Sequence, residues 1–154
     1  MELSDILGVE AVRAPLKATS KKRLLQDLAE MAEAVYGLPS AIAYKALMDR
    51  EALGPTGVGR GVAIPHARFP GVDRVIGMFV RLEKPVDFES IDRQPVDLVF
   101  ALFAPESAGA EHLKALARVS RTLRSEAVCA KLRSTFDPSA IYAILTDGKA
   151  ERAA

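Results

Sequence analysis

Two histidines, His66 and His112, are the residues of this chain best suited to chemistry. An unperturbed imidazole has a pKa of about 6.5, so most of it is neutral near pH 7.5 and can act as a nucleophile. His66 directly follows an apolar run that ends in Pro65. Proline cannot donate a ladder hydrogen bond, and it keeps the preceding residue extended. We therefore expect His66 just past the C-terminal end of a strand, where ligands bind in open α/β sheets.

The second histidine, His112, lies in the opening turn of a predicted helix. A helix N-terminus offers free N–H groups and a positive field, which favour a nearby anion and hold a neighbouring imidazole neutral. If the loops carrying the two histidines meet at one sheet edge, His66 would face a helix end that favours phosphate. By spacing alone, a solvated residue at a helix start is the favoured interpretation of His112, and the alternative for His66 is an incidental surface residue.

Arginines could supply the positive charge that phosphoryl transfer needs around the equatorial oxygens. The candidates are Arg50, Arg60 and Arg68, together with the helix start at His112. Arg50 lies near the predicted C-terminus of a helix, where a cation also stabilises the helix dipole. A purely structural role for Arg50 is therefore the alternative at this stage.

A glycine-rich stretch leads to His66, with three glycines at alternate positions between residues 57 and 61. Alternate residues of an extended segment share a face, so one face carries no side chains and its N–H groups are open to a ligand or a packed neighbour. A glycine-rich turn without further function is the alternative. If His66 handles phosphate, the residues expected around the phosphate are Thr56, Gly59, Arg60 and Gly61.

Other kinds of site find little support in the sequence. Two histidines without a third ligand at a suitable spacing do not form a metal motif. The chain has neither a Gly-x-Ser-x-Gly nucleophile motif nor a Walker-type phosphate loop. Cys129 lies on an apolar helical pattern and is expected to be a small buried side chain. We expect no metal and no cofactor, which leaves nucleophilic catalysis by the imidazole of His66.

The composition is typical of one cytoplasmic domain. Apolar residues make up 49% of the 154 residues and aromatic residues 6%, which predicts an aliphatic core. A net charge of +1 argues against binding to nucleic acid or to anionic membranes. The single cysteine fits a reducing compartment, and no apolar run approaches the ~20 residues that would span a bilayer. We expect a single domain over residues 1–154, with a core of about 3–147 and a short frayed tail.

Apolar spacing predicts helices and strands in blocks along the chain. The predicted helices are residues 20–37, 39–54, 111–124, 125–132 and 139–145. The predicted strands are residues 12–16, 62–64, 75–82 and 96–104, with polar connectors at 84–88 and 92–95. Ile42, Leu53 and Leu113 are among the side chains expected to face inward.

The later strands are nearly apolar throughout, so both of their faces must be covered. Long helices precede and follow these strands, and packing them on both faces of a sheet is the simplest solution. The sequence therefore predicts an α/β fold: a three-layer sandwich in which helices flank a mixed β-sheet on both faces.

The motifs resemble those of a known family. The stretch 56–68, which contains Gly-Val-Ala-Ile-Pro-His, resembles the active-site signature of enzyme IIA domains of the mannitol/fructose class in the bacterial phosphoenolpyruvate-dependent phosphotransferase system. The resemblance continues through residues 92–102 and 111–113 and covers roughly residues 3–147. It implies a mixed sheet between helices, in agreement with the fold predicted from the periodicity.

The resemblance also implies that a small histidine phosphocarrier protein, similar to HPr or NPr, phosphorylates His66. Arg50 and His112 would flank the phosphohistidine and stabilise it. The chain looks most similar to the nitrogen-regulatory branch, whose members are phosphorylation-switched regulators of targets such as potassium-transport or sensor proteins. Two alternatives stay open: a sugar-specific enzyme IIA that passes phosphate to a separate enzyme IIB, and a non-phosphorylated interaction module of the same fold.

A histidine that exchanges phosphate with the histidine of another protein must be reachable, because both imidazoles approach one phosphorus in line. We therefore expect His66 in a shallow depression rimmed by apolar residues. Phe69 is the expected exposed anchor, with Leu53 and Val58 behind it.

Overall fold

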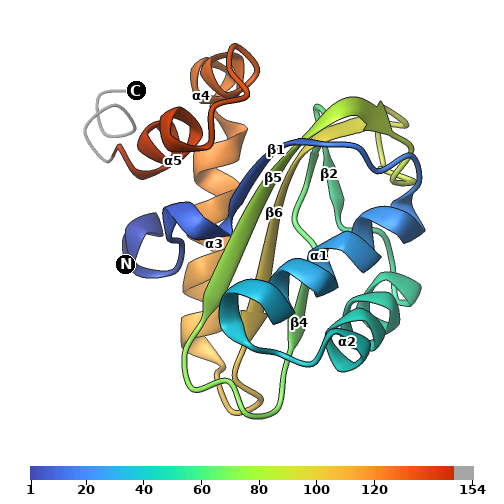
Figure 1. The fold of residues 1–154 in the computed structure, drawn as a ribbon, viewed down its shortest axis with the longest axis vertical. Coiled ribbons are helices and arrows are strands. Elements are labelled where there is room, and N and C mark those ends of the chain that lie inside the picture. The colour runs from blue at the N-terminus through green and yellow to red at the C-terminus, as the bar shows by residue number, and fades with distance from the viewer. Residues whose placement is uncertain (148–154) are drawn as a thin grey trace.

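A mixed six-stranded sheet forms the centre of the computed structural model, which describes residues 1–147 (Figure 1). The strands are β1 (Val12–Leu16), β2 (Gly57–Gly59), β3 (Val62–Ala63), β4 (His66–Arg68), β5 (Ile76–Val86) and β6 (Val96–Ala104). Their order is β1-β5-β6-β3-β2, and β4 also pairs with β6. Strand β6 runs antiparallel to β5 and parallel to β3 and β4. The predicted C-terminal tail, 148–154, lies outside the described residues.

Helices cover both faces of this sheet. They are α1 (Lys21–Tyr36), α2 (Ser40–Ala52), α3 (Ala110–Arg124), α4 (Glu126–Leu132) and α5 (Pro138–Thr146), with short 3₁₀ turns at Leu3–Asp5 and Val9–Ala11. Figure 1 shows α1 and α2 on one side of the sheet and α3, α4 and α5 on the other. The predicted three-layer α/β sandwich is confirmed. Within residues 1–147, none of the helices has the length and hydropathy needed to cross a membrane.

The first helix begins and ends where capping chemistry predicts. The hydroxyl of Ser20 accepts a hydrogen bond from the backbone N–H of Arg23, which satisfies a donor that the first turn leaves free. Gly37 ends the helix at φ 73°, a left-handed conformation that glycine adopts without steric cost. Helix α2 follows at once and ends with Arg50 in its last turn.

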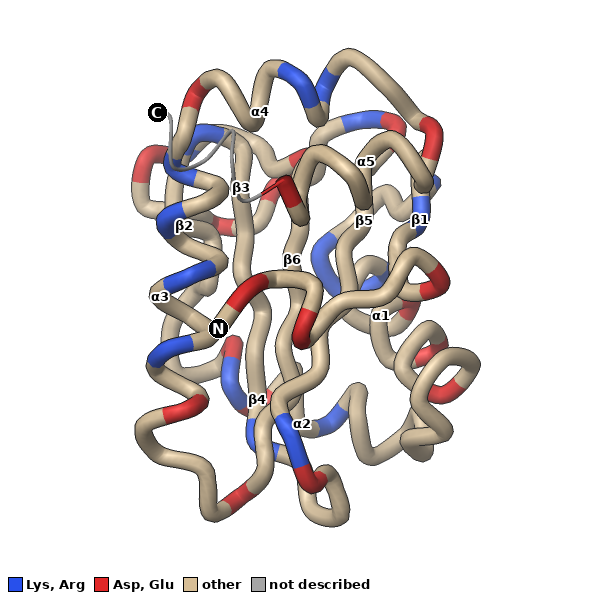
Figure 2. The backbone as a smooth tube through the Cα atoms, turned by 90° about the vertical axis from the view of Figure 1, so that its left-hand side faces the viewer, with Lys and Arg blue, Asp and Glu red and all other residues tan. Residues whose placement is uncertain are grey.

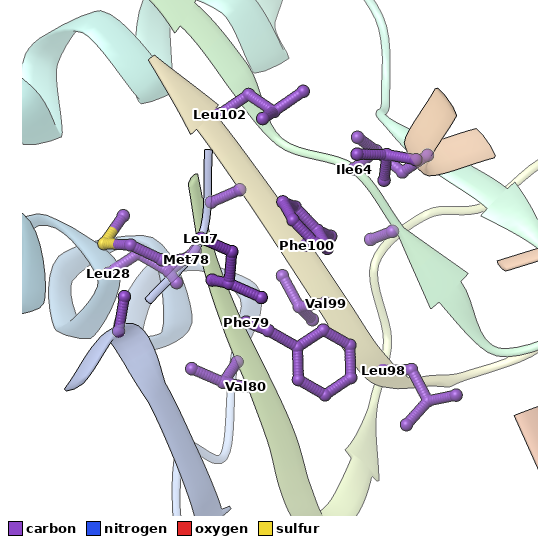
Figure 3. Packing of buried hydrophobic residues seen from close by; sticks show 14 of the residues in the cluster. Leu7, Leu28, Ile64, Met78, Phe79, Val80, Leu98, Val99, Phe100 and Leu102 are labelled. Atoms are coloured by element: carbon purple, nitrogen blue, oxygen red, sulfur yellow. The ribbon is translucent and has the colours of Figure 1, made fainter. Parts of the chain in front are cut away.

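The core is built on β5 and β6. Every residue of β6 except Asp97 is buried, and the rings of Phe79 and Phe100 pack edge to face across the two strands (Figure 3). Such a pair adds about 0.5–1.5 kcal/mol beyond its buried area. Strand β6, which is almost completely buried, is therefore also the strand with which β3 and β4 pair.

Strand β5 continues to Val86, beyond its predicted end, so the expected connector at residues 84–88 is wrong for residues 84–86. The register between β5 and β6 shifts between Arg81 and Val86, and Pro85 lies in that interval. A proline costs no ladder bond where the ladder is already interrupted. The strand therefore extends through a residue that would end it elsewhere.

Three side chains expected to face inward lie at the surface instead. Leu113 is 69% exposed, Leu53 84% and Ile42 49%. Leu113 lies one position after the buried His112, and 100° of helix rotation carries it off the buried face. Leu53 lies beyond the last residue of α2, where helical periodicity no longer applies.

Strands β3 and β4 are two pieces of one line along β6, separated by Ile64 and Pro65. Val62 pairs with Leu98, and His66 pairs with Leu102. His66 therefore follows the end of β3, as predicted, and it is also the first residue of β4. Between the two strands, the N–H of Ile64 donates to the carbonyl oxygen of Thr56, and the carbonyl oxygen of Ile64 lies beside the imidazole of His66.

Candidate functional site

The imidazole of His66 is fixed by the backbone just before it. Nδ1 of His66 lies 2.9 Å from the carbonyl oxygen of Ile64. A carbonyl oxygen can only accept, so the proton of the neutral ring resides on Nδ1 and the lone pair on Nε2. In this tautomer Nε2 is the nucleophilic atom.

The second histidine faces the first. The rings of His66 and His112 have centroids 5.5 Å apart and planes at 72°, in an edge-to-face arrangement. His112 comes from the first turn of α3 and is 7% exposed. Its Nε2 is buried without a hydrogen-bond partner among residues 1–147. The two histidines therefore meet, as predicted for the loops that carry them. The buried Nε2 of His112 can form a hydrogen bond with a further group.

Both imidazoles are held neutral. Burial lowers the pKa of His66, and the Arg50 guanidinium lowers it further; the Ile64 carbonyl and Glu51 act in the opposite direction. Burial also lowers the pKa of His112, with smaller contributions from His66 and Arg68. Because both values fall below 6.5, the neutral form dominates at pH 7.

Arg50 lies within electrostatic reach of His66, at the end of α2. One of its nitrogens donates to the carbonyl oxygen of Gly54 at 2.9 Å, which stabilises the turn that follows the helix. The guanidinium has further N–H donors, since it carries five in all. Arg50 can therefore hold its own turn and still attract an anion near His66.

Arg68 acts on the loop before α3. Its guanidinium donates to the carbonyl oxygens of Glu106 at 2.8 Å and Ala108 at 2.7 Å, with a longer contact to Pro105 at 3.5 Å. This loop leads directly into the turn that carries His112. Arg68 thus ties the end of β4 to the start of α3.

A buried acid next to Arg50 was not identified from the sequence. The Glu51 carboxylate accepts hydrogen bonds from the hydroxyl of Thr56 and, at 3.2 Å, from the Thr56 backbone N–H. Lys21 lies 2.8 Å from the same carboxylate. Acidic residues in the last turn of a helix are common surface features, so nothing in the local pattern singled out Glu51.

The hydroxyl of Thr56, which we expected to face the phosphate, is therefore already bonded to Glu51. Thr56 is 5% exposed, and its carbonyl oxygen accepts from the N–H of Ile64 at 3.0 Å. Thr56 contacts the site through the backbone of the residue that holds His66.

The glycine-rich stretch folds as a tight hairpin that turns away from His66, so Arg60, Gly59 and Gly61 are not gathered around the imidazole. The carbonyl oxygen of Gly61 accepts from the N–H of Leu98, whereas His66 pairs four residues farther along β6. Four strand residues span ~13 Å. The expectation that these three residues surround a phosphate on His66 is corrected by this register.

Arg60 has local partners at the hairpin. Its backbone N–H donates to Asp92 at 2.8 Å, and its guanidinium lies 3.7 Å from Glu126. Residues 59–61 all have positive φ, between 58° and 97°. Two glycines two residues apart are thus explained by a turn rather than by a phosphate cradle.

Phe69, the expected apolar anchor, is buried. It is 3% exposed and packs edge to face on Phe103, with ring centroids 5.6 Å apart. Its N–H donates to Ala104, so the pairing with β6 continues past β4 and turns the ring inward. Leu53 and Val58 are exposed, by 84% and 57%. Leu113, which directly follows His112, is 69% exposed as well, so the exposed apolar residues next to site residues in the chain include Leu113.

Within residues 1–147, no group of three or more His, Cys, Asp or Glu side chains is arranged to hold a metal ion. Cys129 is buried, and burial raises the pKa of its thiol. The reactive groups that the fold brings together are therefore the two imidazoles and the arginines near them.

Comparison with known proteins agrees with this geometry. The family model described as phosphoenolpyruvate-dependent sugar phosphotransferase system, EIIA 2, matches residues 5–148. A nitrogen regulatory protein of Bradyrhizobium diazoefficiens is 50% identical over 145 residues, which cover 94% of this chain and 95% of that protein.

Solved structures show the same fold. The nitrogen regulatory protein IIA-Ntr of Neisseria meningitidis superposes with a TM-score of 0.88 at 35% identity, over 94% of this chain and 99% of that one. The mannitol IIA of Escherichia coli gives a TM-score of 0.74 at 25% identity, over 90% and 98% of the two chains. The chain therefore belongs to the EIIA type-2 family of the phosphoenolpyruvate-dependent phosphotransferase system, and its relatives include nitrogen regulatory proteins.

Proposed function

We propose that this protein accepts a phosphoryl group on Nε2 of His66 from a histidine phosphocarrier protein similar to HPr or NPr. The observation that supports the proposal best is the contact of Nδ1 with the Ile64 carbonyl, which leaves a nucleophilic Nε2 beside His112. In the transfer, the P–N bond in the carrier breaks as the bond from phosphorus to Nε2 forms. Since the ring is neutral at pH 7, no prior loss of a proton is needed.

Arg50 and His112 stabilise the transferred group in this proposal. The Arg50 guanidinium supplies positive charge for the phosphoryl oxygens, and an N–H of His112 can donate to one of them. A phosphoryl oxygen would also give the buried Nε2 of His112 the partner it lacks among the described residues. Arg50 and His112 come from two different helices, so they could contact the phosphoryl group from two sides.

We propose regulation as the downstream role, because relatives with high coverage are named nitrogen regulatory proteins. We propose that the protein acts in the cytoplasm. The proposed targets are regulatory proteins such as potassium-transport or sensor proteins. Charge supports a switch. Residues 110–124 of α3 contain four basic residues and one acidic residue, a net charge of +3 (Figure 2). A phosphoryl group of about −1.5 to −2 near the start of this helix would change how charged partners dock.

A sugar-specific role is the second candidate. The structural match to the mannitol IIA of Escherichia coli favours it, because the chemistry at His66 would be the same. The two candidates differ in the acceptor: a separate enzyme IIB in one case and a regulatory target in the other. A non-phosphorylated module is less well supported, since Arg50, His66 and His112 are all present in a consistent arrangement.

Phosphorylation with defined components tests the proposal. The protein is incubated with phosphoenolpyruvate, enzyme I and the phosphocarrier, and the added phosphate should be labile in acid and stable in base. His66→Ala should abolish labelling. Arg50→Ala or His112→Ala should slow it by roughly ten- to a thousandfold while leaving the melting temperature within a few degrees. Labelling that persists in His66→Ala would disprove the assignment. A subsequent chase with enzyme IIB components separates the sugar-specific role from the regulatory one.

A further inference from the structure

Glu51 is an acid with an almost buried side chain, and the transfer step described above assigns it no direct role. Its side chain is 5% exposed. A buried carboxylate is costly unless its partners compensate for the lost water, and truncating one partner of such a pair is strongly destabilising. Here Thr56 and Lys21 are those partners. The arrangement fixes three segments relative to one another: the start of α1, the end of α2 and the approach to β2.

A chain of hydrogen bonds connects Glu51 to His66 through Thr56 and Ile64. Thr56 is held by Glu51 through both its hydroxyl and its N–H. The Thr56 carbonyl oxygen accepts from the N–H of Ile64 at 3.0 Å, and the Ile64 carbonyl oxygen accepts from Nδ1 of His66 at 2.9 Å. Ile64 is thus oriented on one side by Thr56 and orients the imidazole on the other. A shift of Thr56 would move Ile64, and with it the carbonyl oxygen that selects the tautomer of His66.

Glu51 is also the neighbour of Arg50 in the chain, at the end of α2. Arg50 donates to the carbonyl oxygen of Gly54, and Glu51 reaches across the same turn to Thr56. The two contacts close the turn from its two sides. The positive charge and the nucleophile of the site therefore depend on one short connection, residues 50–56.

We propose that Glu51 is a positioning residue, which holds Thr56 so that the Ile64 carbonyl meets Nδ1 of His66 and leaves the lone pair on Nε2. Its effect on transfer rests on the proposed function of His66, but its effect on the imidazole can be measured without any phosphate.

The test compares Glu51→Gln with Glu89→Gln. Glu89 also pairs with Lys21, at 3.6 Å, but its side chain is 75% exposed and it has no contact with Thr56. The control therefore removes a negative charge that pairs with Lys21 but leaves the hydrogen bonds between Glu51 and Thr56 in place. Nitrogen-15 NMR of the unphosphorylated imidazoles, at a pH where His66 is neutral, reports which ring nitrogen carries the proton.

In wild type and in Glu89→Gln, His66 should be found in the Nδ1–H form. In Glu51→Gln, the Nε2–H form should also be populated, and the pKa of His66 should fall, because Glu51 favours the charged ring. Transfer from the carrier should lose roughly ten- to a hundredfold in kcat with little change in KM, as expected for a misplaced reacting group.

Wild-type imidazole shifts and wild-type kcat in Glu51→Gln, with only a lower melting temperature, would overturn the proposal. If Glu51→Gln does not fold, Thr56→Val provides the same comparison, because it removes the hydroxyl donor at nearly constant volume, with Thr56→Ser as the variant that should restore the Nδ1–H form. A wild-type protein that takes no phosphate would refute the proposed function, while the NMR comparison would still decide the role of Glu51.

Discussion

The imidazole of His66 can be a good nucleophile near neutral pH because the fold, rather than a catalytic base, keeps it deprotonated. Burial and Arg50 lower the pKa of the ring, while the Ile64 carbonyl favours the proton on Nδ1. His112 is lowered mainly by burial. The same electrostatics that suit a nucleophile also make the folded state sensitive to acid.

The two histidines should make the protein less stable as the pH falls from 7.5 to 5.5. Their folded pKa values lie below the unfolded value of about 6.5, so the unfolded chain binds protons first. Their contribution to stability is complete above pH 6.5 and is lost as the pH falls through the folded pKa values. The melting temperature of wild type should drop by a few degrees more than that of His66→Gln/His112→Gln over this range.

Calorimetric melts of both proteins at half-unit pH steps would measure this difference. Equal slopes for wild type and the double variant would show that the histidines are not the groups responsible.

Sequence reasoning located His66 and His112 because a proline after an apolar strand and a helix start are local signals. It missed Glu51, because a carboxylate that reaches Lys21, thirty residues away in the chain, leaves no periodic trace. Phe69 was misplaced for a related reason. The Pro70 turn suggests a surface position, but the N–H of Phe69 still pairs with Ala104 and directs the ring into the core.

At the scale of elements, the site depends on how the loop before α3 is attached to β4. Arg68 at the end of β4 donates to backbone carbonyls of residues 105, 106 and 108. These carbonyls belong to the loop between β6 and α3, which also has an internal hydrogen bond from the N–H of Ala108 to the carbonyl oxygen of Pro105. Since α3 starts directly after the loop, the placement of His112 depends on this contact.

Arg68→Met should therefore loosen the first turn of α3 without unfolding the sheet. Amides of residues 113–116, the first that are hydrogen-bonded within the helix, should exchange with deuterium roughly ten times faster, a change of about 1.4 kcal/mol in local opening, while amides of β6 should keep their protection. Hydrogen exchange followed by mass spectrometry would measure both. Arg13→Met, an exposed arginine on the edge strand β1, is the control. Unchanged exchange in α3 would show that the loop holds its position without Arg68.

The elements themselves were largely predictable, because β6 and the amphipathic helices have strong patterns. The hairpin of β2 and β3 was not. Its alternate glycines suggested an open face for a ligand, whereas Gly57 packs so close to Ser90 that a Cβ would collide with the Ser90 side chain. Close backbone packing and ligand binding both call for glycine, so the sequence alone could not separate them.

At the scale of the whole molecule, three of the exposed apolar side chains are close in the chain to the residues of the candidate site: Leu53, Val58 and Leu113. Leu53, at the end of α2, and Val58, in the edge strand β2, lie on either side of Thr56 in the chain, and Leu113 directly follows His112. Val9, which is 43% exposed, precedes β1 at the opposite edge. We propose that the phosphocarrier uses Leu53 and Val58 as apolar contacts when it docks.

Leu53→Ser/Val58→Ser should raise the KM for the phosphocarrier by roughly tenfold, because apolar contacts of a small transient interface are lost. The value of kcat should stay within twofold, since neither side chain reaches the reacting atoms. Val9→Ser is the control, with no expected change in either constant. Steady-state phosphorylation at varied carrier concentration provides both constants. An unchanged KM in the double variant would place the carrier elsewhere on the surface.

The two layers of helices contribute different parts of the site: Arg50 comes from α2 on one face of the sheet and His112 from α3 on the other (Figure 1). A molecule in which either layer has detached would still carry His66, but it would lack one of the two groups proposed to stabilise the phosphate. With His66 as the acceptor, the carrier would then favour fully assembled copies.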